Sequence, residues 1–227
     1  MSRRDNASFR CERCRVHQSL CFCERIPRLE TKTRLTLVIH RREVRKPTNT
    51  GALAATCLTN SQIWVRGHCD GSDQDWALDP NAQTLLLFPH ERAGQLQSCV
   101  DPSRPCTLVV PDGTWRQAVK VGSRVPSLAQ VPWVTLPPGP PTLYRLRQES
   151  HPQGLATMEA IARAFGILEG PAIQEALERV FRLFVERTLW ARGSLDASDV
   201  QDGLPAGVKR HIPSLGQNPD NHRKSML

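Results

Sequence analysis

Long apolar runs are missing from this sequence of 227 residues. No stretch reaches the ~18 consecutive apolar residues that a membrane-spanning helix needs, so we expect no membrane segment. The first ten residues, MSRRDNASFR, lack the apolar core of a secretory signal. We therefore expect a cytoplasmic protein, and disulfides are rare in that compartment.

Motifs of several common enzyme classes are also absent. The chain contains no G-x-G-x-x-G, no Walker P-loop, no H-E-x-x-H and no G-x-S-x-G. Dinucleotide, nucleotide triphosphate, zinc-protease and serine-hydrolase chemistry therefore receive no support. The stretch PPGPP (137–141) does not replace a phosphate-binding loop, because proline lacks the N–H that such a loop donates.

Acidic residues are outnumbered, since 22 Asp and Glu face 30 Lys and Arg, giving a formal net charge of +8. This balance favours a polyanionic partner, nucleic acid ahead of an anionic membrane. The alternative is that the charge only keeps the protein in solution. The segment RREVRK (41–46) is either a solvated basic loop or a contact to phosphates. In the second case we predict that RNA contacts Arg41, Arg42, Arg45, Lys46, Asn49 and Thr50.

Short β-branched and Leu-rich runs alternate with helical patterns. Strands are expected at 33–40, 62–66, 84–89, 106–111 and from 132 into the proline-rich loop. Helices are expected at 48–58, 113–123, 158–168 and 172–192. Thr48 or Asn49 suits the cap of the first helix, and Thr157 that of the third, which Gly170 and Pro171 end. This alternation indicates an α/β fold with a mainly parallel sheet, whose ligands bind beyond the carboxyl ends of the strands.

Three units follow from this pattern. Residues 1–31 form a small Cys-rich unit, residues 32–192 a catalytic domain, and residues 193–227 a polar tail. The tail scatters Gly and Pro among polar residues. We expect it to be loosely ordered or docked in an extended form.

Four of the eight cysteines lie within thirteen residues. They follow the pattern C-x2-C-x6-C-x-C, a spacing with which four thiolates can close a tetrahedral zinc site. A short segment with little core of its own would gain folding energy from the ion. His17 could replace one ligand, and the alternative is a set of unliganded thiols. The predicted ligands are Cys11, Cys14, Cys21 and Cys23, whereas Cys57 and Cys106 are expected in the core.

The stretch PDGTW (111–115) places an acid at the end of a buried strand. Asp112 could act as a general base or orient a donor group of a ligand. Gly113 permits a close approach of the backbone, and Thr114 with the first helical N–H groups can hold polar ligand atoms. The alternative is that Asp112 caps the following helix and Trp115 fills the core.

The segment YRLR (144–147) is a second candidate. In an extended conformation Tyr144 and Leu146 face one way, while Arg145 and Arg147 face the other. Two guanidinium groups on one side could bind a carboxylate or a phosphate bidentately. The alternative is a solvated basic edge.

Taken in order, these motifs resemble the DTW-domain family, specifically the bacterial tRNA-uridine aminocarboxypropyltransferases. The resemblance runs from about residue 11 to residue 192. It rests on five stretches: CERCRVHQSLCFCERIP (11–27), KPTNTG (46–51), VVPDGTWRQAVK (109–120), LYRLRQES (143–150) and GLATMEAIA (154–162). The sequence departs from the family at AVKVGS (118–123), which concerns local packing.

The resemblance implies a SPOUT-like domain with a C-terminal trefoil knot. It also implies S-adenosylmethionine as cosubstrate and tRNA as partner, with transfer of the 3-amino-3-carboxypropyl group to N3 of a uridine in the variable loop. Methylthioadenosine would be released. Asp112 is the expected catalytic residue. The residues expected to bind the cosubstrate are Phe88, Pro89, Asp112, Gly113, Thr114, Trp115, Leu136, Tyr144, Arg145, Leu146, Arg147 and Thr157.

Two other functions fit the same motifs. A SPOUT-type RNA methyltransferase would use the same fold and cosubstrate but transfer a different carbon. A non-enzymatic RNA-binding protein would use the zinc unit and the basic segment alone, and it would need no pocket for the sulfonium compound.

Overall fold

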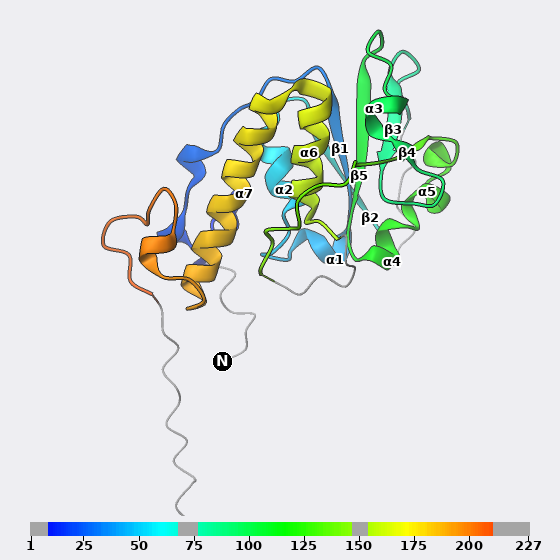
Figure 1. The fold of residues 1–227 in the computed structure, drawn as a ribbon. Helices are drawn as coiled ribbons and strands as arrows, with labels where there is room; N and C mark the ends of the chain where they lie inside the picture. Colours follow the sequence, from blue (N-terminus) through cyan, green and yellow to red (C-terminus); the bar gives the residue numbers. More distant parts are fainter. Residues whose placement is uncertain (1–8, 68–76, 147–153, 211–227) are drawn as a thin grey trace, which may run out of the picture.

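The structure is a computed structural model that describes residues 9–67, 77–146 and 154–210. Its centre is a six-stranded sheet with the order β2-β1-β5-β3-β6-β4, in which every pairing is parallel (Figure 1). The strands are β1 (Arg34–His40), β2 (Ser61–Arg66), β3 (Gln83–Leu87), β4 (Gly94–Gln95), β5 (Cys106–Asp112) and β6 (Trp133–Thr135). The five predicted strands are confirmed, and the two-residue β4 is an addition.

Both faces of the sheet are buried, as parallel sheets require. All seven residues of β5 are buried, and β5 lies between β1 and β3. Alternate residues of β5 point to opposite faces, so Leu108 and Val110 belong to one core cluster and Val109 to another. This arrangement fixes the end of β5 in the middle of the sheet.

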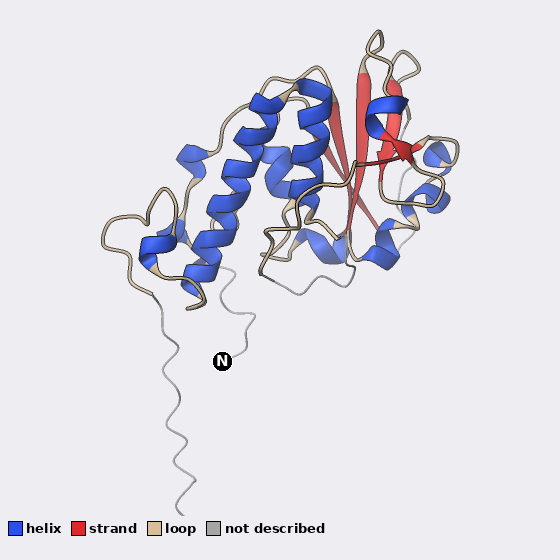
Figure 2. Cartoon of the chain, viewed as in Figure 1, coloured by secondary structure: helices blue, strands red, loops and turns tan. Residues whose placement is uncertain are grey.

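Helices cover the two faces unequally (Figure 2). The face carrying Leu108 packs against α2 (Gly51–Cys57), α6 (Thr157–Glu169) and α7 (Pro171–Ala191). The opposite face is covered by shorter segments that bring Val125, Leu128 and Val131 against Val109. These include α4 (Trp115–Ala118), α5 (Val121–Arg124) and η4 (Pro126–Leu128).

The two long helices form an antiparallel pair joined at a glycine. Gly170 has a φ of 106°, a conformation that L side chains rarely adopt, and Pro171 begins α7. The predicted stop at these two residues is thus confirmed. The predicted cap is wrong, because Ala156 occupies the N-cap position and Thr157 is the first helical residue.

Two further expectations need correction. The basic segment after β1 is a short helix, α1 (Arg41–Val44), because His40 Nδ1 accepts a hydrogen bond from the Arg42 N–H at its start. The helix expected at 113–123 is broken into α4 and α5. The small α3 (Leu96–Cys99) follows β4. Among the described residues, no helix combines the length and the apolar character needed to cross a membrane.

Both ends of the described chain pack against α7 (Figure 1). The Cys-rich segment contains η2 (Gln18–Leu20) and η3 (Cys23–Arg25), and its Leu20 and Phe22 belong to the same core cluster as α6 and α7. The segment after α7 contains η5 (Ala197–Asp199), and Val200 joins that cluster too. A single core therefore links the first, middle and last described segments.

Candidate functional site

The carboxyl ends of the strands open into a cleft of about 760 Å³. Its walls come from the end of β3, the turn between β5 and α4, the proline-rich loop after β6 and the first turns of α6. Parallel sheets bind their ligands at this edge. The volume also lies within the range of about 300–1,000 Å³ that is usual for small-molecule pockets. The cleft is therefore the candidate ligand site.

Asp112 ends β5 beside this cleft and is only 8% exposed. Its Oδ2 accepts a hydrogen bond from Asn49 Nδ2 at 2.5 Å, and its Oδ1 accepts one from Thr157 Oγ1 at 2.6 Å. Asp112 does not cap α4, because Thr114 is the N-cap residue. The carboxylate is thus held by side chains from α6 and from the loop before α2.

Two glycines allow the backbone to approach closely here. A Cβ on Gly51 would lie 2.8 Å from Asp112 Oδ2, and real Cβ atoms essentially never come closer than 3.0 Å to another heavy atom. A Cβ on Gly113 would lie 2.9 Å from Gln117 Oε1. Helix α2 can therefore begin directly against the carboxylate only because residue 51 has no side chain.

The turn after Asp112 exposes an indole at the cleft. Gln117 Oε1 accepts a hydrogen bond from the Thr114 N–H at 2.8 Å, which closes a capping box at the start of α4. Trp115 is 37% exposed, and its ring centroid lies 4.8 Å from that of Phe88. Trp115 therefore lines the cleft instead of filling the core.

Segments far apart in the sequence meet around Asp112. Tyr144 Oη donates a hydrogen bond to the Thr48 carbonyl at 2.8 Å, and the Met158 N–H donates one to Thr50 Oγ1 at 3.3 Å. The TNTG stretch, Tyr144 and the start of α6 therefore lie next to one another and to the PDGTW turn. Such convergence of chain segments at a strand end is what a binding site on an α/β sheet requires.

Most residues predicted to bind the cosubstrate lie at the cleft. Those that line it are Phe88, Pro89, Gly113, Thr114, Trp115, Leu136 and Thr157. Tyr144 and Leu146 are buried and Arg145 is exposed, and none of these three lines the cleft. Arg147 lies outside the described residues.

The residues predicted to contact RNA divide into two groups. Arg42, Arg45 and Lys46 are exposed on or beside α1, and Arg41 is half-buried. Asn49 and Thr50 are buried, and Asn49 Oδ1 also accepts the Ala52 N–H at 3.0 Å. These two side chains form part of the wall around Asp112.

The sequence interpretation missed two charged residues of the site. Arg163 lies two turns after Thr157 on α6 and is the only ionised side chain among the described residues that line the cleft. The spacing of Thr157, Ala160 and Arg163 on one helical face was the available signal. Glu43 was hidden within the basic segment RREVRK, and it is buried beside Asp112.

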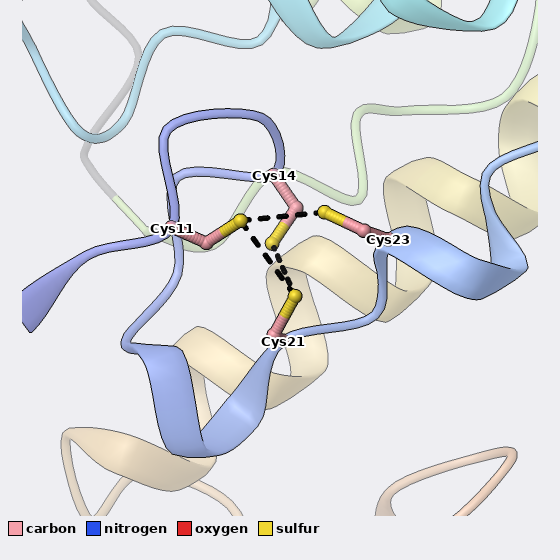
Figure 3. A group of neighbouring side chains, drawn as sticks. All are labelled: Cys11, Cys14, Cys21 and Cys23. Carbon is pink, nitrogen blue, oxygen red and sulfur yellow. Dashed lines mark hydrogen bonds between the residues drawn. The ribbon is translucent and has the colours of Figure 1, made fainter.

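The four clustered cysteines point their sulfur atoms toward one another (Figure 3). The Sγ atoms of Cys11 and Cys23 are 3.3 Å apart, those of Cys14 and Cys21 are 3.7 Å apart, and all four lie within 4.8 Å of one another. A tetrahedron of thiolates with bonds of about 2.3 Å would have sulfur atoms about 3.8 Å apart. The cluster therefore has the donor set and the size of a zinc site.

The thiols differ in their affinity for protons. Burial raises the pKa of Cys14 to about 11 and also raises the pKa of Cys23. At Cys11 burial acts in the same direction, but hydrogen bonds, beginning with that from the Cys14 backbone, lower the pKa to about 6. A bound cation would replace the protons of all four sulfur atoms.

A buried arginine joins this cluster to α7. Arg187 is 3% exposed and donates from one nitrogen to the carbonyls of Leu20 at 2.9 Å and Cys21 at 3.0 Å. Its other terminal nitrogen donates to the Gly203 carbonyl at 3.3 Å. Burial and Arg25 lower the pKa of the guanidinium, while Cys14 and Cys21 oppose them. One side chain thus holds the Cys-rich segment and the C-terminal segment on the same helix.

Comparisons with known proteins agree with the motifs found in the sequence. Two tRNA-uridine aminocarboxypropyltransferases 2 resemble the chain: that of Macaca fascicularis at 30% identity over 74% of this chain, and that of Mus musculus at 31% over 74%. The chain spans 60% of the length of each. The enzyme of the same name from Drosophila melanogaster is 27% identical over 77% of this chain and 72% of its own length. No solved structure matches. The DTW domain model matches residues 8–189, and the chain therefore belongs to the DTW domain family.

Proposed function

We propose that this protein transfers the 3-amino-3-carboxypropyl group of S-adenosylmethionine to N3 of a uridine in the variable loop of tRNA. The observation that carries the proposal is the cleft at the strand ends, with Asp112 fixed beside it by two hydrogen bonds. The names of the similar proteins, which state a tRNA uridine and an aminocarboxypropyl group, support it.

The reaction is an alkyl transfer from a sulfonium to a nitrogen. A bond forms between N3 of the uridine and the γ-carbon of the methionine moiety, while the bond from that carbon to sulfur breaks. The bonding electrons move to sulfur, which leaves as the thioether of methylthioadenosine. The N3 proton passes to a carboxylate or to water.

Three carbons are attached to the sulfonium, so the site must choose among them by position. Only the carbon held in line with N3 at near-contact distance reacts at a useful rate. The walls that would hold the adenosine portion are the apolar and proline-rich surfaces around Phe88 and Leu136. The other end of the donor would then lie toward Gly113 and Thr157, next to Asp112.

Asp112 has two chemical roles open to it, that of a base for N3 and that of an anchor for the donor. Both of its oxygens already accept hydrogen bonds from neutral side chains, and the group is largely buried. Such fixed geometry supports the anchoring role, because an anchor benefits from rigid placement. We assign Asp112 to holding the donor.

The exposed bases beside the site supply the contact to tRNA. Arg42, Arg45 and Lys46 lie on or next to α1, immediately before the loop that holds Asn49 against Asp112. Their positive charges would bind backbone phosphates without reading sequence. The target uridine would then be presented to the open side of the cleft.

The four cysteines would hold a structural Zn²⁺. Its bonds to the four sulfur atoms would cross-link the N-terminal segment and stabilise its fold. The proposed organisation is a zinc unit at 1–31, a catalytic domain at 32–192 and a tail at 193–227. We further propose that the loops after β6 form a SPOUT-like knot. We also propose that the protein acts in the cytoplasm.

Mass spectrometry of tRNA nucleosides after incubation with S-adenosylmethionine tests the proposal. The expected product is uridine carrying the aminocarboxypropyl group, together with methylthioadenosine. Methyluridine with S-adenosylhomocysteine would instead identify a methyltransferase. Binding of tRNA with no binding of S-adenosylmethionine would identify a non-enzymatic RNA-binding protein.

A further inference from the structure

The wall of the cleft contains one charged side chain among the residues that the structure describes, that of Arg163. The rest of the wall consists of apolar side chains, prolines, glycines and the neutral side chains of threonine and glutamine. Arg163 itself is half-buried. Attraction between opposite charges grows as water is excluded from around them. An anionic group that enters the cleft would therefore be drawn to Arg163.

The acid that would ordinarily pair with Arg163 on α6 is already engaged. An acid four residues before an arginine is well placed for an ion pair on a helix, and Glu159 has that position. However, Glu159 is buried, its Oε1 accepts the Leu143 N–H at 2.7 Å, and its Oε2 accepts hydrogen bonds from Thr142 Oγ1 and the Ala156 N–H. Within the described part of the chain Arg163 forms no ion pair.

The proline-rich loop holds the guanidinium in place. Arg163 Nη2 donates a hydrogen bond to the Pro140 carbonyl at 2.7 Å. A Cβ on residue 139 would lie 3.0 Å from Arg163 Nη1, so Gly139 lets the loop pass close to the guanidinium. A guanidinium carries five N–H groups in a rigid fork. Pro140 is the one hydrogen-bond acceptor of Arg163 among the described residues, so further N–H groups can bind a carboxylate.

We infer that Arg163 binds the α-carboxylate of the donor. The inference rests on the proposed function and deepens it. Arg163 and Thr157 both line the cleft from α6, and their backbones are about 9 Å apart along the helix axis. Thr157 Oγ1 donates to Asp112 Oδ1. The amino-acid end of the donor would therefore lie along the first turns of α6, with its carboxylate toward Arg163.

This contact would act on the group that is transferred. Of the three groups on the sulfonium, only the aminocarboxypropyl group carries a negative charge. Three covalent bonds separate its carboxyl carbon from the γ-carbon, so binding the carboxylate restrains the γ-carbon as well. The methyl group has no such restraint, and the carbon that is held in line with N3 is the one that reacts. Arg163 is therefore a specificity-determining residue.

Equilibrium binding of three probes tests this inference. The first is S-adenosylhomocysteine, the second is its decarboxylated analogue with hydrogen in place of the α-carboxylate, and the third is methylthioadenosine. We expect the wild-type protein to bind S-adenosylhomocysteine about 50-fold more tightly than the decarboxylated analogue, because a guanidinium and a carboxylate form charge-assisted hydrogen bonds. Equal affinity for these two probes would overturn the inference without any variant.

Two substitutions of Arg163 should change this preference in a graded way. Arg163→Met should reduce it to less than about threefold, whereas Arg163→Lys keeps the charge without the fork and should retain about tenfold. The matched control is Arg182→Met, because Arg182 is exposed on α7, donates to Gln201 Oε1 and does not line the cleft. The control should retain the full preference. A full preference in Arg163→Met would contradict the inference.

The alternative is that Arg163 only holds the proline-rich loop through the Pro140 carbonyl. Its loss would then displace a wall of the cleft and weaken all three probes by the same factor. We expect instead that the affinity of Arg163→Met for methylthioadenosine, which lacks the carboxylate, stays within about threefold of wild type. An equal loss of affinity for all three probes would assign Arg163 to the loop and overturn the inference.

The same measurements separate this inference from the proposed function. If the wild type transfers the aminocarboxypropyl group but does not distinguish S-adenosylhomocysteine from its decarboxylated analogue, only the inference fails. If the wild type binds none of the three probes, the proposed function fails and the inference fails with it.

Discussion

The cleft at the strand ends and the cysteine cluster are built in opposite ways. The cleft is positioned by a buried strand and two long helices, so its residues come from segments up to about a hundred positions apart, as the bond from Tyr144 to Thr48 shows. The four cysteines lie within thirteen residues of the sequence, and their sulfur atoms lie within 4.8 Å of one another. The cleft depends on the core for its shape, whereas a metal ion in the cysteine cluster would stabilise part of the core. Substitutions at each site should therefore affect stability and activity to different extents.

The largest effect on stability is expected from removing the proposed metal ion. Cys14→Ser, or treatment with a chelator, should lower the free energy of unfolding by about 3–5 kcal/mol and the melting temperature by about 10 °C. The reason is that Leu20 and Phe22 lose the cross-link that holds them against α7. Differential scanning calorimetry with metal analysis measures this. Cys99→Ser is the control, and a metal-free protein with unchanged melting would contradict the zinc assignment.

A large effect on activity, with little on stability, is expected at the strand end. Asp112→Ala should lower the rate of the proposed transfer to tRNA about 100- to 1,000-fold, because in that proposal the carboxylate holds the donor in position. Asp112→Asn should restore folding contacts with Thr157 but not activity. Single-turnover kinetics with saturating tRNA provide the measurement. Full activity in Asp112→Ala would remove this residue from the chemistry.

Replacing Arg187 should lower stability by an intermediate amount and should affect the cysteine cluster without affecting the cleft. Arg187→Met should cost about 2–3 kcal/mol of stability, because three backbone carbonyls lose their buried donor. Metal release to a chromophoric chelator should also become faster. Affinity for methylthioadenosine should stay unchanged. A weaker affinity for methylthioadenosine together with an unaltered rate of metal release would show that the two regions are not separable in this way.

The smallest effect is expected at Trp115. Because its ring is partly exposed and packs on Phe88, Trp115→Ala should weaken donor binding about tenfold while changing the free energy of unfolding by less than about 1 kcal/mol. Trp115→Phe should recover most of the affinity. Titration with S-adenosylhomocysteine measures both variants. An unchanged affinity in the alanine variant would exclude the indole from the binding surface.

The sequence predicted what is local and missed what is assembled. The apolar runs at β1, β3 and β5 and the spacing of the cysteines carry their own pattern, so these elements were found. The two-residue β4 and the four-residue α1 are too short for any periodicity to be visible. Their existence depends on neighbours already in place.

The same distinction applies to the candidate site. Asp112 and Trp115 were found because strand, acid and glycine occur in succession. Glu43 was missed because four bases surround it in the sequence, and only the fold turns it inward. Arg145 or Arg147 was expected to grip the donor. Among the residues that the structure describes, the cationic side chain that lines the cleft is Arg163, and Arg147 lies outside them. Spacing along a chain cannot tell which of several arginines the backbone carries to a cavity.

The proline-rich loop after β6 has a consequence for the purine of the proposed donor. Four of the five residues from 137 to 141 are prolines, so this wall offers carbonyl oxygens and almost no N–H groups. An adenine ring presents an exocyclic amine that such carbonyls can receive. A hypoxanthine ring presents an oxygen at the same place, and two acceptors would then face each other. The inosine counterpart of the donor should accordingly be a poor substrate, whatever happens at its amino-acid end.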